Sequence, residues 1–166
     1  MANIFKVEGK KNIVLLISAI ILTEGVGFLS GFLGMYNKET YDKLIKPSFS
    51  PPGCVFPIIW AILYFLMALA FYRILLRGKE GKNIKKAVTY YIIQLALNFL
   101  WTIIFFRFNL YGLAFIELLI LLAFILLTTF EFYKYDKVSA FLMIPYILWG
   151  SFAGILNFSI WALNEM

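Results

Sequence analysis

The sequence predicts an all-α membrane protein, a five-transmembrane-helix bundle that forms one domain over residues 1–166. Hydrophobic residues make up 63% of the chain and charged residues only 14%. A soluble domain is about half apolar and about a quarter charged, and a soluble fold of this length could not hide so much apolar surface from water. Lipid is therefore expected to be part of its solvent.

Five apolar segments of 19 to 23 residues account for most of the chain. At a rise of about 1.5 Å per residue, each helix would be roughly 30 Å long, which matches the hydrocarbon core of a bilayer. Backbone polar groups in lipid need partners within their own segment, so helices are expected rather than open strands. The predicted helices are Ile13–Gly34, Val55–Leu76, Val88–Phe106, Leu110–Phe132 and Phe141–Leu163.

The connections between these helices differ in character. The first, residues 35–54, is long, and its prolines Pro47, Pro51 and Pro52 stiffen it and exclude a helix around them. The third, Arg107–Asn109, is so short that the third and fourth helices are expected to be antiparallel neighbours. The remaining two are the basic stretch 77–86 and the short polar stretch 133–140.

The Lys and Arg residues predict the orientation in the membrane. The side that holds the N-terminus and the second and fourth connections carries 11 of them, and the other side carries 4. Because positive residues favour the cytoplasmic side, we expect a multi-pass protein of the cell membrane with its N-terminus in the cytoplasm. The proline-rich connection 35–54 would then lie outside.

The residue types that are missing exclude several kinds of site. The chain has no histidine, and Cys54 is its single cysteine, so an intrachain disulfide, a zinc cluster and a histidine-based catalytic triad are excluded. No phosphate-binding GxxxxGK[ST] loop occurs. The net charge of +6 is explained by the flanks of the membrane spans. We therefore expect no cofactor, no metal and no nucleic acid.

Small residues recur four positions apart in the first and last helices, where they permit close helix approach. The pairs are Gly27 with Gly31, Ser30 with Gly34, and Gly150 with Gly154. Packing within the bundle and packing between two copies are both consistent with this pattern, and the first is slightly favoured.

Polar and aromatic residues share faces of the predicted third and fifth helices. Gln94, Asn98, Trp101 and Phe105 form a narrow stripe at 100° per residue. Amides inside hydrocarbon need partners, and bonds between helices and contact with a ligand are about equally consistent with them. On the fifth helix the shared face consists of Trp149, Ala153, Leu156, Asn157 and Ile160.

Trp60 lies five residues inside the second helix, on one side with Phe56, Leu63 and Met67 and more loosely Tyr64. Trp101 and Trp161 are close to helix ends and fit a role at the membrane interface. Trp149 is deeper. Tryptophans and amides on several helices favour a pocket for a flat, apolar ligand with a few polar groups.

Two carboxyl groups lie inside the predicted spans. Ionisable residues there indicate function by default. Glu24 is near the middle of the first helix with no Lys or Arg at its depth, so it is expected to be protonated or hydrogen-bonded. A proton relay is one interpretation of Glu24. Glu117 lies seven residues into the fourth helix.

Three separated motifs, which agree in order and spacing, resemble the TspO/translocator protein family. This family is also called tryptophan-rich sensory protein or peripheral-type benzodiazepine receptor. Lys46–Trp60 reads KPSFSPPGCVFPIIW, Gln94–Phe106 reads QLALNFLWTIIFF and Pro145–Asn164 reads PYILWGSFAGILNFSIWALN. Glu117 matches a glutamate that is common in the family's fourth helix.

The resemblance implies a five-helix bundle, often dimeric, that binds porphyrins such as protoporphyrin IX and benzodiazepine-site ligands in a pocket under the first loop. Trp60 and Trp149 map to the tryptophans of that pocket, and Asn98 maps to its third-helix asparagine. Phe49 and Cys54 depart from the family, because many members have tryptophan there. The other expected ligand-binding residues are Tyr64, Phe56, Gln94, Phe152, Ala153 and Asn157, under a lid that carries Pro47, Phe49, Pro51, Pro52 and Cys54.

Porphyrin binding is the function that these observations favour, in a membrane receptor with a role in sensing or tetrapyrrole homeostasis and with a homodimer as the expected assembly. The lack of histidine favours free porphyrin over haem, whose iron would lack its usual ligand. Light-dependent oxidative degradation of porphyrin is an alternative, with Trp60 and Trp149 as the catalytic residues. Porphyrin transport is another alternative, and a purely structural scaffold ranks below both.

Overall fold

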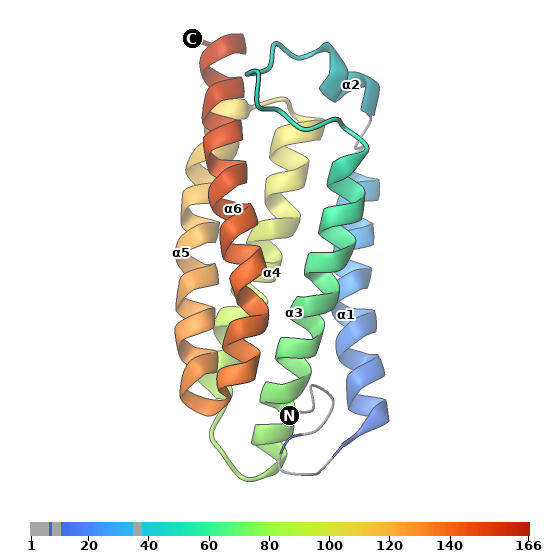
Figure 1. The fold of residues 1–166 in the computed structure, drawn as a ribbon, viewed down its shortest axis with the longest axis vertical. Coiled ribbons are helices and arrows are strands. Elements are labelled where there is room, and N and C mark those ends of the chain that lie inside the picture. The colour runs from blue at the N-terminus through green and yellow to red at the C-terminus, as the bar shows by residue number, and fades with distance from the viewer. Residues whose placement is uncertain (1–6, 8–10, 35–37) are drawn as a thin grey trace.

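The computed structural model describes residue 7 and residues 11–34 and 38–166. Five long helices lie side by side and form one bundle (Figure 1). Within the described ranges, five helices are long and apolar enough to cross a membrane, which confirms the predicted fold. The elements are α1 (Ile13–Leu33), α2 (Lys38–Lys43), α3 (Val55–Lys79), α4 (Lys85–Thr102), the π-helix η1 (Ile103–Arg107), α5 (Tyr111–Tyr135) and α6 (Lys137–Asn164).

Four of the helices extend further than the apolar segments predict. α3 ends at Lys79 rather than at residue 76, α4 begins at Lys85 rather than at residue 88, and Asp136 alone separates α5 from α6. Hydropathy marks the hydrocarbon core, whereas Lys and Arg continue a helix beyond it because their long stems reach water. The predicted polar connection 133–140 is therefore mostly helical.

The turn between η1 and α5 agrees with the predicted tight connection. Asn109 has a φ of 55°, a left-handed conformation that asparagine adopts more readily than most residues. Phe108 and Leu110 donate backbone hydrogen bonds to η1, at 3.1 and 3.2 Å. The chain thus reverses within a few residues, and α4 and α5 pack against each other.

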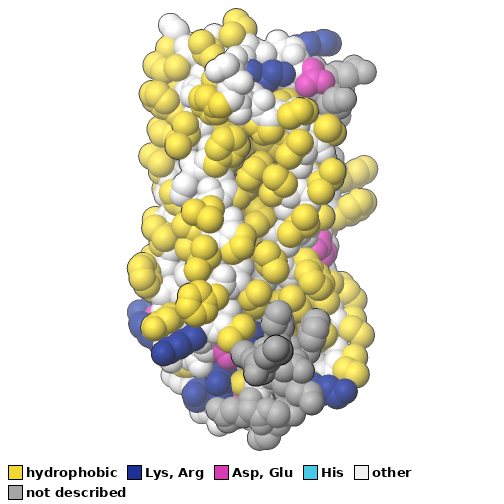
Figure 2. All heavy atoms as spheres, in the orientation of Figure 1, with side chains coloured by type: hydrophobic (Ala, Val, Ile, Leu, Met, Phe, Trp, Pro, Cys, Tyr) yellow, Lys and Arg dark blue, Asp and Glu magenta, His cyan; other side chains and the backbone are white. Residues whose placement is uncertain are grey.

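The face of the bundle shown in Figure 2 is apolar along most of its length. Large hydrophobic side chains are exposed on every long helix, with Phe28 on α1 and Leu148 on α6 among the most exposed. Lys and Arg side chains gather toward the ends in the same view. This is the surface of a protein that meets lipid along its sides and water at its ends.

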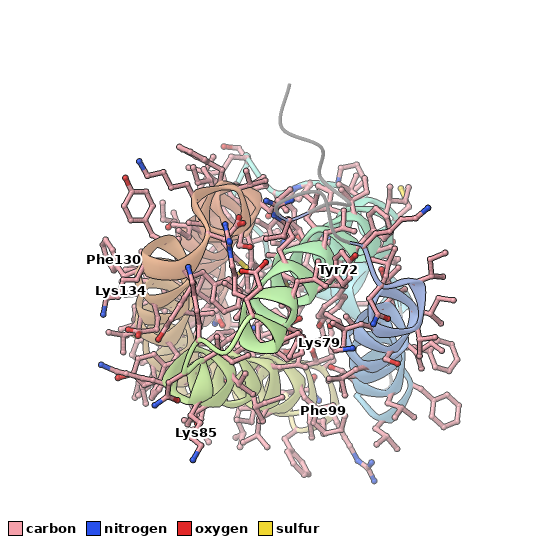
Figure 3. The ribbon with its side chains drawn as sticks, turned by 90° about the horizontal axis from the view of Figure 1, so that it is seen from below. Tyr72, Lys79, Lys85, Phe99, Phe130 and Lys134 are labelled. Atoms are coloured by element: carbon pink, nitrogen blue, oxygen red, sulfur yellow. The ribbon has the colours of Figure 1, made fainter. Side chains whose placement is uncertain are left out.

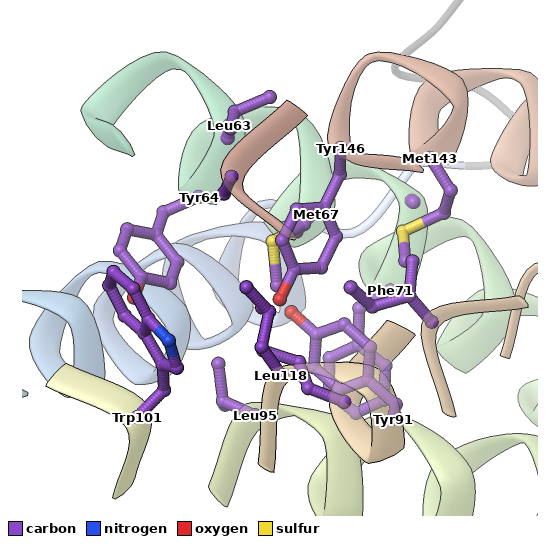
Figure 4. Packing of buried hydrophobic residues seen from close by; sticks show 14 of the residues in the cluster. Leu63, Tyr64, Met67, Phe71, Tyr91, Leu95, Trp101, Leu118, Met143 and Tyr146 are labelled. Carbon is purple, nitrogen blue, oxygen red and sulfur yellow. The ribbon is translucent and has the colours of Figure 1, made fainter. Parts of the chain in front are cut away.

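Aromatic rings fill the interior (Figure 4). The ring of Tyr91 stacks on Phe71 with centroids 4.1 Å apart and on Phe132 at 5.9 Å. Met67 and Met143 are fully buried beside them. The hydroxyl groups of Tyr91 and Tyr146 point toward one another in Figure 4, and Tyr91 shares a 2.7 Å hydrogen bond with Thr23 of α1.

A buried ion pair closes the end of the bundle at which α5 meets α6. Asp136 accepts hydrogen bonds from Arg73 Nε and Nη2 at 3.0 and 2.8 Å and from the backbone N–H of Ser139 at 2.8 Å. Seen from this end, Lys85 and Lys134 point outward (Figure 3). The pair therefore joins α3 to the α5–α6 turn.

Some glycines of the small-residue motifs pack closely inside the bundle, and others have no neighbour within 4 Å of an added Cβ. A Cβ at Gly27 would overlap the ring of Tyr64, and one at Gly34 would lie 2.7 Å from Thr102. A Cβ at Gly31 or Gly154 would meet nothing within 4 Å. One member of each overlapping motif in α1 thus serves packing within the bundle, and the homodimer stays a prediction.

Candidate ligand-binding site

A cavity of about 490 Å³ lies between α1, α3 and the end of α4. Its walls are mostly apolar and include Trp60 and Tyr64 of α3, Trp101 of α4 and Phe106 of η1. Glu24 of α1 is the only acidic or basic side chain among the described residues that line it. Ligand pockets commonly measure roughly 300–1,000 Å³ and combine aromatic walls with few polar groups, so this cavity has the character of a binding site.

Trp60 lies in the wall of this cavity, half-buried. Its ring is 5.5 Å from that of Tyr64, tilted by 30°, and 6.1 Å from that of Tyr146 in an edge contact. Tyr64 and Trp101 lie at one end of the aromatic cluster in Figure 4. A flat ligand in the cavity would therefore meet aromatic faces from two helices.

Asn98 lies behind this wall and is 1% exposed. Its Oδ1 accepts a hydrogen bond from the hydroxyl of Tyr64, and its Nδ2 donates to the hydroxyl of Tyr146 at 2.7 Å. The amide thus joins α4 to α3 and α6. Of these three residues, Tyr64 is the one that lines the cavity.

Trp101 does not take the interface position that its place near a helix end predicts. It is 7% exposed, and its Nε1 donates to Oδ1 of Asn157 at 3.1 Å. The Asn157 amide also donates to the carbonyl of Tyr111 at 2.8 Å. The interface prediction is wrong because this residue belongs to the buried stripe of α4, and both amide atoms of Asn157 bond within the protein.

Trp149 of α6 packs against aromatic residues beside the cavity. Its ring contacts Phe56 at 5.8 Å and Phe152 at 5.4 Å, and Phe152 meets Phe49 of the first connection at 6.3 Å. Phe56 lines the cavity, whereas Trp149 contacts the Phe56 ring and is not among the described lining residues. Of the two predicted tryptophans, Trp60 is thus the one that lines the cavity.

Two further polar residues lie in the interior with no partner. Gln94 and Glu117 are buried, and neither side chain makes a hydrogen bond to any residue that the structure describes. The ring contacts Tyr90–Phe124 and Phe105–Tyr111 fix the register of α4 and η1 on α5, which places Glu117 near the level of Asn98. Ala153, another predicted site residue, lines a separate void of about 20 Å³ beneath Tyr41.

The described part of the first connection covers the end of the bundle at which α6 ends (Figure 1), and it is held there by contacts with α3 and α6. Tyr41 is buried, with its ring 5.0 Å from that of Phe56, and its hydroxyl donates to the carbonyl of Pro51 at 3.4 Å. The Asn164 amide of α6 bonds the backbone N–H and C=O of Ile45 at 3.1 and 2.9 Å. Burial raises the pKa of the Tyr41 phenol.

The lid residues themselves lie toward the outside. Phe49, Pro52 and Cys54 are exposed, and Pro51 is half-buried. Tyr41, which holds the connection down on Phe56, was not among the predicted site residues, because no periodic pattern marks a single tyrosine in a short polar helix. The lid is therefore anchored by a residue outside its proline-rich part.

Comparison with known proteins identifies the family. The model of the TspO/MBR family matches residues 19–162. The tryptophan-rich protein TspO of Chlorobaculum tepidum is 36% identical over 155 residues, which are 93% of this chain and 98% of that protein. The translocator protein of Bos taurus is 35% identical over 147 residues, 83% of this chain and 85% of that protein.

A third relative is the tryptophan-rich sensory protein of Cereibacter sphaeroides, which is 38% identical over 126 residues, 76% of this chain and 77% of that protein. The matched residues run from within α1 almost to the end of α6, so they cover most or all of each long helix and every described residue that lines the cavity. This multi-pass membrane protein belongs to the TspO/MBR family.

Proposed function

We propose that the cavity between α1, α3 and α4 binds a porphyrin such as protoporphyrin IX, and that the protein is a membrane receptor in tetrapyrrole sensing or homeostasis. The observation that carries this proposal is the aromatic wall of the 490 Å³ cavity, with Trp60 and Trp101 on different helices. Flat aromatic rings gain offset stacking and edge contacts from such walls. The same walls suit flat synthetic ligands of the benzodiazepine site.

The names of the relatives agree with this role. Relatives are called sensory and translocator proteins, and a receptor that retains a small molecule within the membrane suits either word. The anchored first connection supports the proposal, because Tyr41 seats it on Phe56, a residue of the cavity wall. A homodimer in the cell membrane is part of the same proposal and rests on the family resemblance.

Porphyrin titration tests the proposal on three matched variants. Protoporphyrin IX is added to the detergent-solubilised protein in the dark, and binding is followed by the change in the porphyrin absorption band. We expect saturable binding that Trp60→Leu weakens about tenfold, because the variant removes a ring from the cavity wall. Trp149→Leu should weaken it less, since Trp149 is not among the described residues that line the cavity and contacts its wall at Phe56.

Trp161→Leu is the control, because Trp161 packs on Phe115 and Phe158, away from the cavity. Absence of saturable binding to the parent protein would overturn the proposal. Equal losses in the Trp60 and Trp161 variants would show that porphyrin binds elsewhere.

Illumination of the same samples tests the degradation alternative. The Trp60 ring is in contact with the rings of Tyr64 and Tyr146, and such a cluster can exchange electrons with a photoexcited ligand, while dissolved oxygen would be the oxidant that degradation needs. Loss of the porphyrin spectrum under light, abolished in Trp60→Leu and retained in Trp161→Leu, would favour an enzyme. An unchanged spectrum would favour a receptor.

A further inference from the structure

Glu24 is a carboxyl group in the middle of α1 that faces the cavity. It is half-buried and makes no hydrogen bond or ion pair with any residue that the structure describes. Tyr64 and Tyr91 are its electrostatic neighbours, and both are neutral hydroxyl groups. A carboxyl group at this depth is expensive to keep without a partner and is expected to serve a function.

The other residues that line the cavity also favour a positively charged ligand. The rings of Trp60, Tyr64 and Trp101 line it, and the faces of aromatic rings carry a negative quadrupole that attracts cations. No lysine or arginine is among its described lining residues. An anion inside would therefore lose its water without gaining a positively charged partner among the described lining residues.

Arg107 is a basic residue that directly follows Phe106, a residue of the cavity wall, in the sequence. It lies at the end of η1, where its Nη1 donates to the carbonyl of Leu33 at the last residue of α1, at 3.3 Å. Its guanidinium is thus held at the end of the bundle rather than at the depth of Glu24, which is two to three turns away along α1. A ligand with a cationic nitrogen and a carboxylate would therefore meet the carboxyl group of Glu24 at one level and the guanidinium of Arg107 at the other.

We infer that Glu24 selects the ligand, so that the cavity takes a flat aromatic molecule that presents a cationic or N–H-donating nitrogen to this carboxyl group and keeps carboxylates outside. The inference rests on the proposed function, because it assumes the same cavity. A porphyrin meets both requirements, since its N–H groups are at the centre of the macrocycle and its carboxylates are on the edge. A hydrogen bond to a charged partner in so apolar a site is among the stronger kinds.

Two acridines of matched shape test the inference without porphyrin. 9-Aminoacridine is a cation at neutral pH, and acridine-9-carboxylate is an anion. Each is titrated into the full-length detergent-solubilised protein, with fluorescence as the readout. We expect the parent to bind the cation at least about tenfold more tightly than the anion, Glu24→Gln to reduce this ratio to about twofold, and Glu24→Asp to retain most of it.

Glu80→Gln is the matched control, because Glu80 pairs with Arg77 at the end of α3, outside the cavity. That variant should keep the parent ratio and so correct for partition of the probes into detergent. A parent ratio near one would overturn the inference whether or not Glu24→Gln folds. An unchanged ratio in folded Glu24→Gln would overturn it too.

Protoporphyrin IX titrated into the parent separates the two proposals. If porphyrin does not bind but the cation preference depends on Glu24, the inference stands for this cavity and the porphyrin proposal falls. If porphyrin binds and the acridines show no preference, the porphyrin proposal stands and the inference falls.

Discussion

Asn98 joins three helices through one side chain. Its amide bonds Tyr64 of α3 and Tyr146 of α6, and all three residues are buried. Asn98→Ala would leave two buried hydroxyl groups without a partner. Since such bonds contribute about 1 kcal/mol each in membrane proteins, we expect a loss of about 2 kcal/mol in the free energy of unfolding, measured by thermal or SDS denaturation in detergent.

A pair of tyrosine variants separates this bond from general effects of removing a hydroxyl group. Tyr146→Phe removes the acceptor of Asn98 Nδ2 and should cost about 1 kcal/mol. Tyr90 is half-buried on the same helix as Asn98 and meets Phe124 by ring contact, so Tyr90→Phe should change little. Equal stability of these two variants would contradict the bridging role.

The sequence predicts which residues of α4 face inward but leaves their partners open. The helical period groups Gln94, Asn98, Trp101 and Phe105, and all four are buried. It leaves open whether the amides meet a ligand or other helices, because the partners of Asn98 and Trp101 come from α3 and α6. The spans are apolar on nearly every side, so their rotation about their axes is not readable from hydropathy.

At the scale of elements, Gly27 sets the approach of α1 to α3. An added Cβ would overlap the Tyr64 ring, so Gly27→Ala displaces either the helix or the ring. We expect a loss of about 1–3 kcal/mol in stability together with weaker porphyrin binding, since Tyr64 lines the cavity. Thermal denaturation and the dark titration measure the two effects.

Gly25→Ala is the control on the same helix, because a Cβ there meets nothing within 4 Å. It should be neutral or stabilise by up to about 1 kcal/mol through helix propensity. If both variants behave alike, the close approach of α1 and α3 does not depend on Gly27.

Asp136 makes the stability of the α5–α6 turn depend on pH. Burial opposes its charge, but hydrogen bonds from Arg73 and Ser139 and the charges of Arg73 and Arg77 hold the pKa of this carboxyl below its usual value. The stabilisation that the Asp136 carboxylate provides is therefore complete above about pH 4, which is the pKa of an aspartate in an unfolded chain. It is lost as the pH falls through the lower pKa of the folded state.

Asp136→Asn removes this contribution at neutral pH. Because it removes a buried carboxylate that accepts hydrogen bonds from two nitrogens of Arg73, we expect a loss of about 3–5 kcal/mol at pH 7. Below about pH 4 the difference in free energy of unfolding between this variant and the parent should become smaller. Denaturation at pH 7, 4.5 and 3 measures it. Asp42→Asn removes a carboxylate 3.6 Å from Lys46 at the surface and should cost under about 1 kcal/mol.

For the whole molecule, hydropathy predicts the number of helices and their order because each span is a separate apolar segment. It does not predict where the cavity lies. α1 has only Ala19, Thr23 and Ser30 buried among its described residues, because most of its surface faces outward, and Glu24 lines the space between this helix and α3. That space depends on the packing of three helices, which no single segment encodes.

The orientation of the bundle is testable through its single cysteine. Cys54 is exposed at the start of α3, and the basic connection lies at the other end of this helix. The predicted orientation puts Cys54 outside. A membrane-impermeant maleimide should therefore label Cys54 in intact cells.

The reciprocal variant Cys54→Ser/Lys82→Cys places the thiol beyond the other end of α3, whose 25 residues span roughly 37 Å. It should react only after lysis. The reverse pattern would put the lid and its Tyr41 anchor on the cytoplasmic side, so that a ligand entering beneath the lid would come from the cytoplasm. Labelling of both thiols in intact cells would instead mean that both orientations occur, which 11 Lys and Arg residues against 4 are expected to prevent.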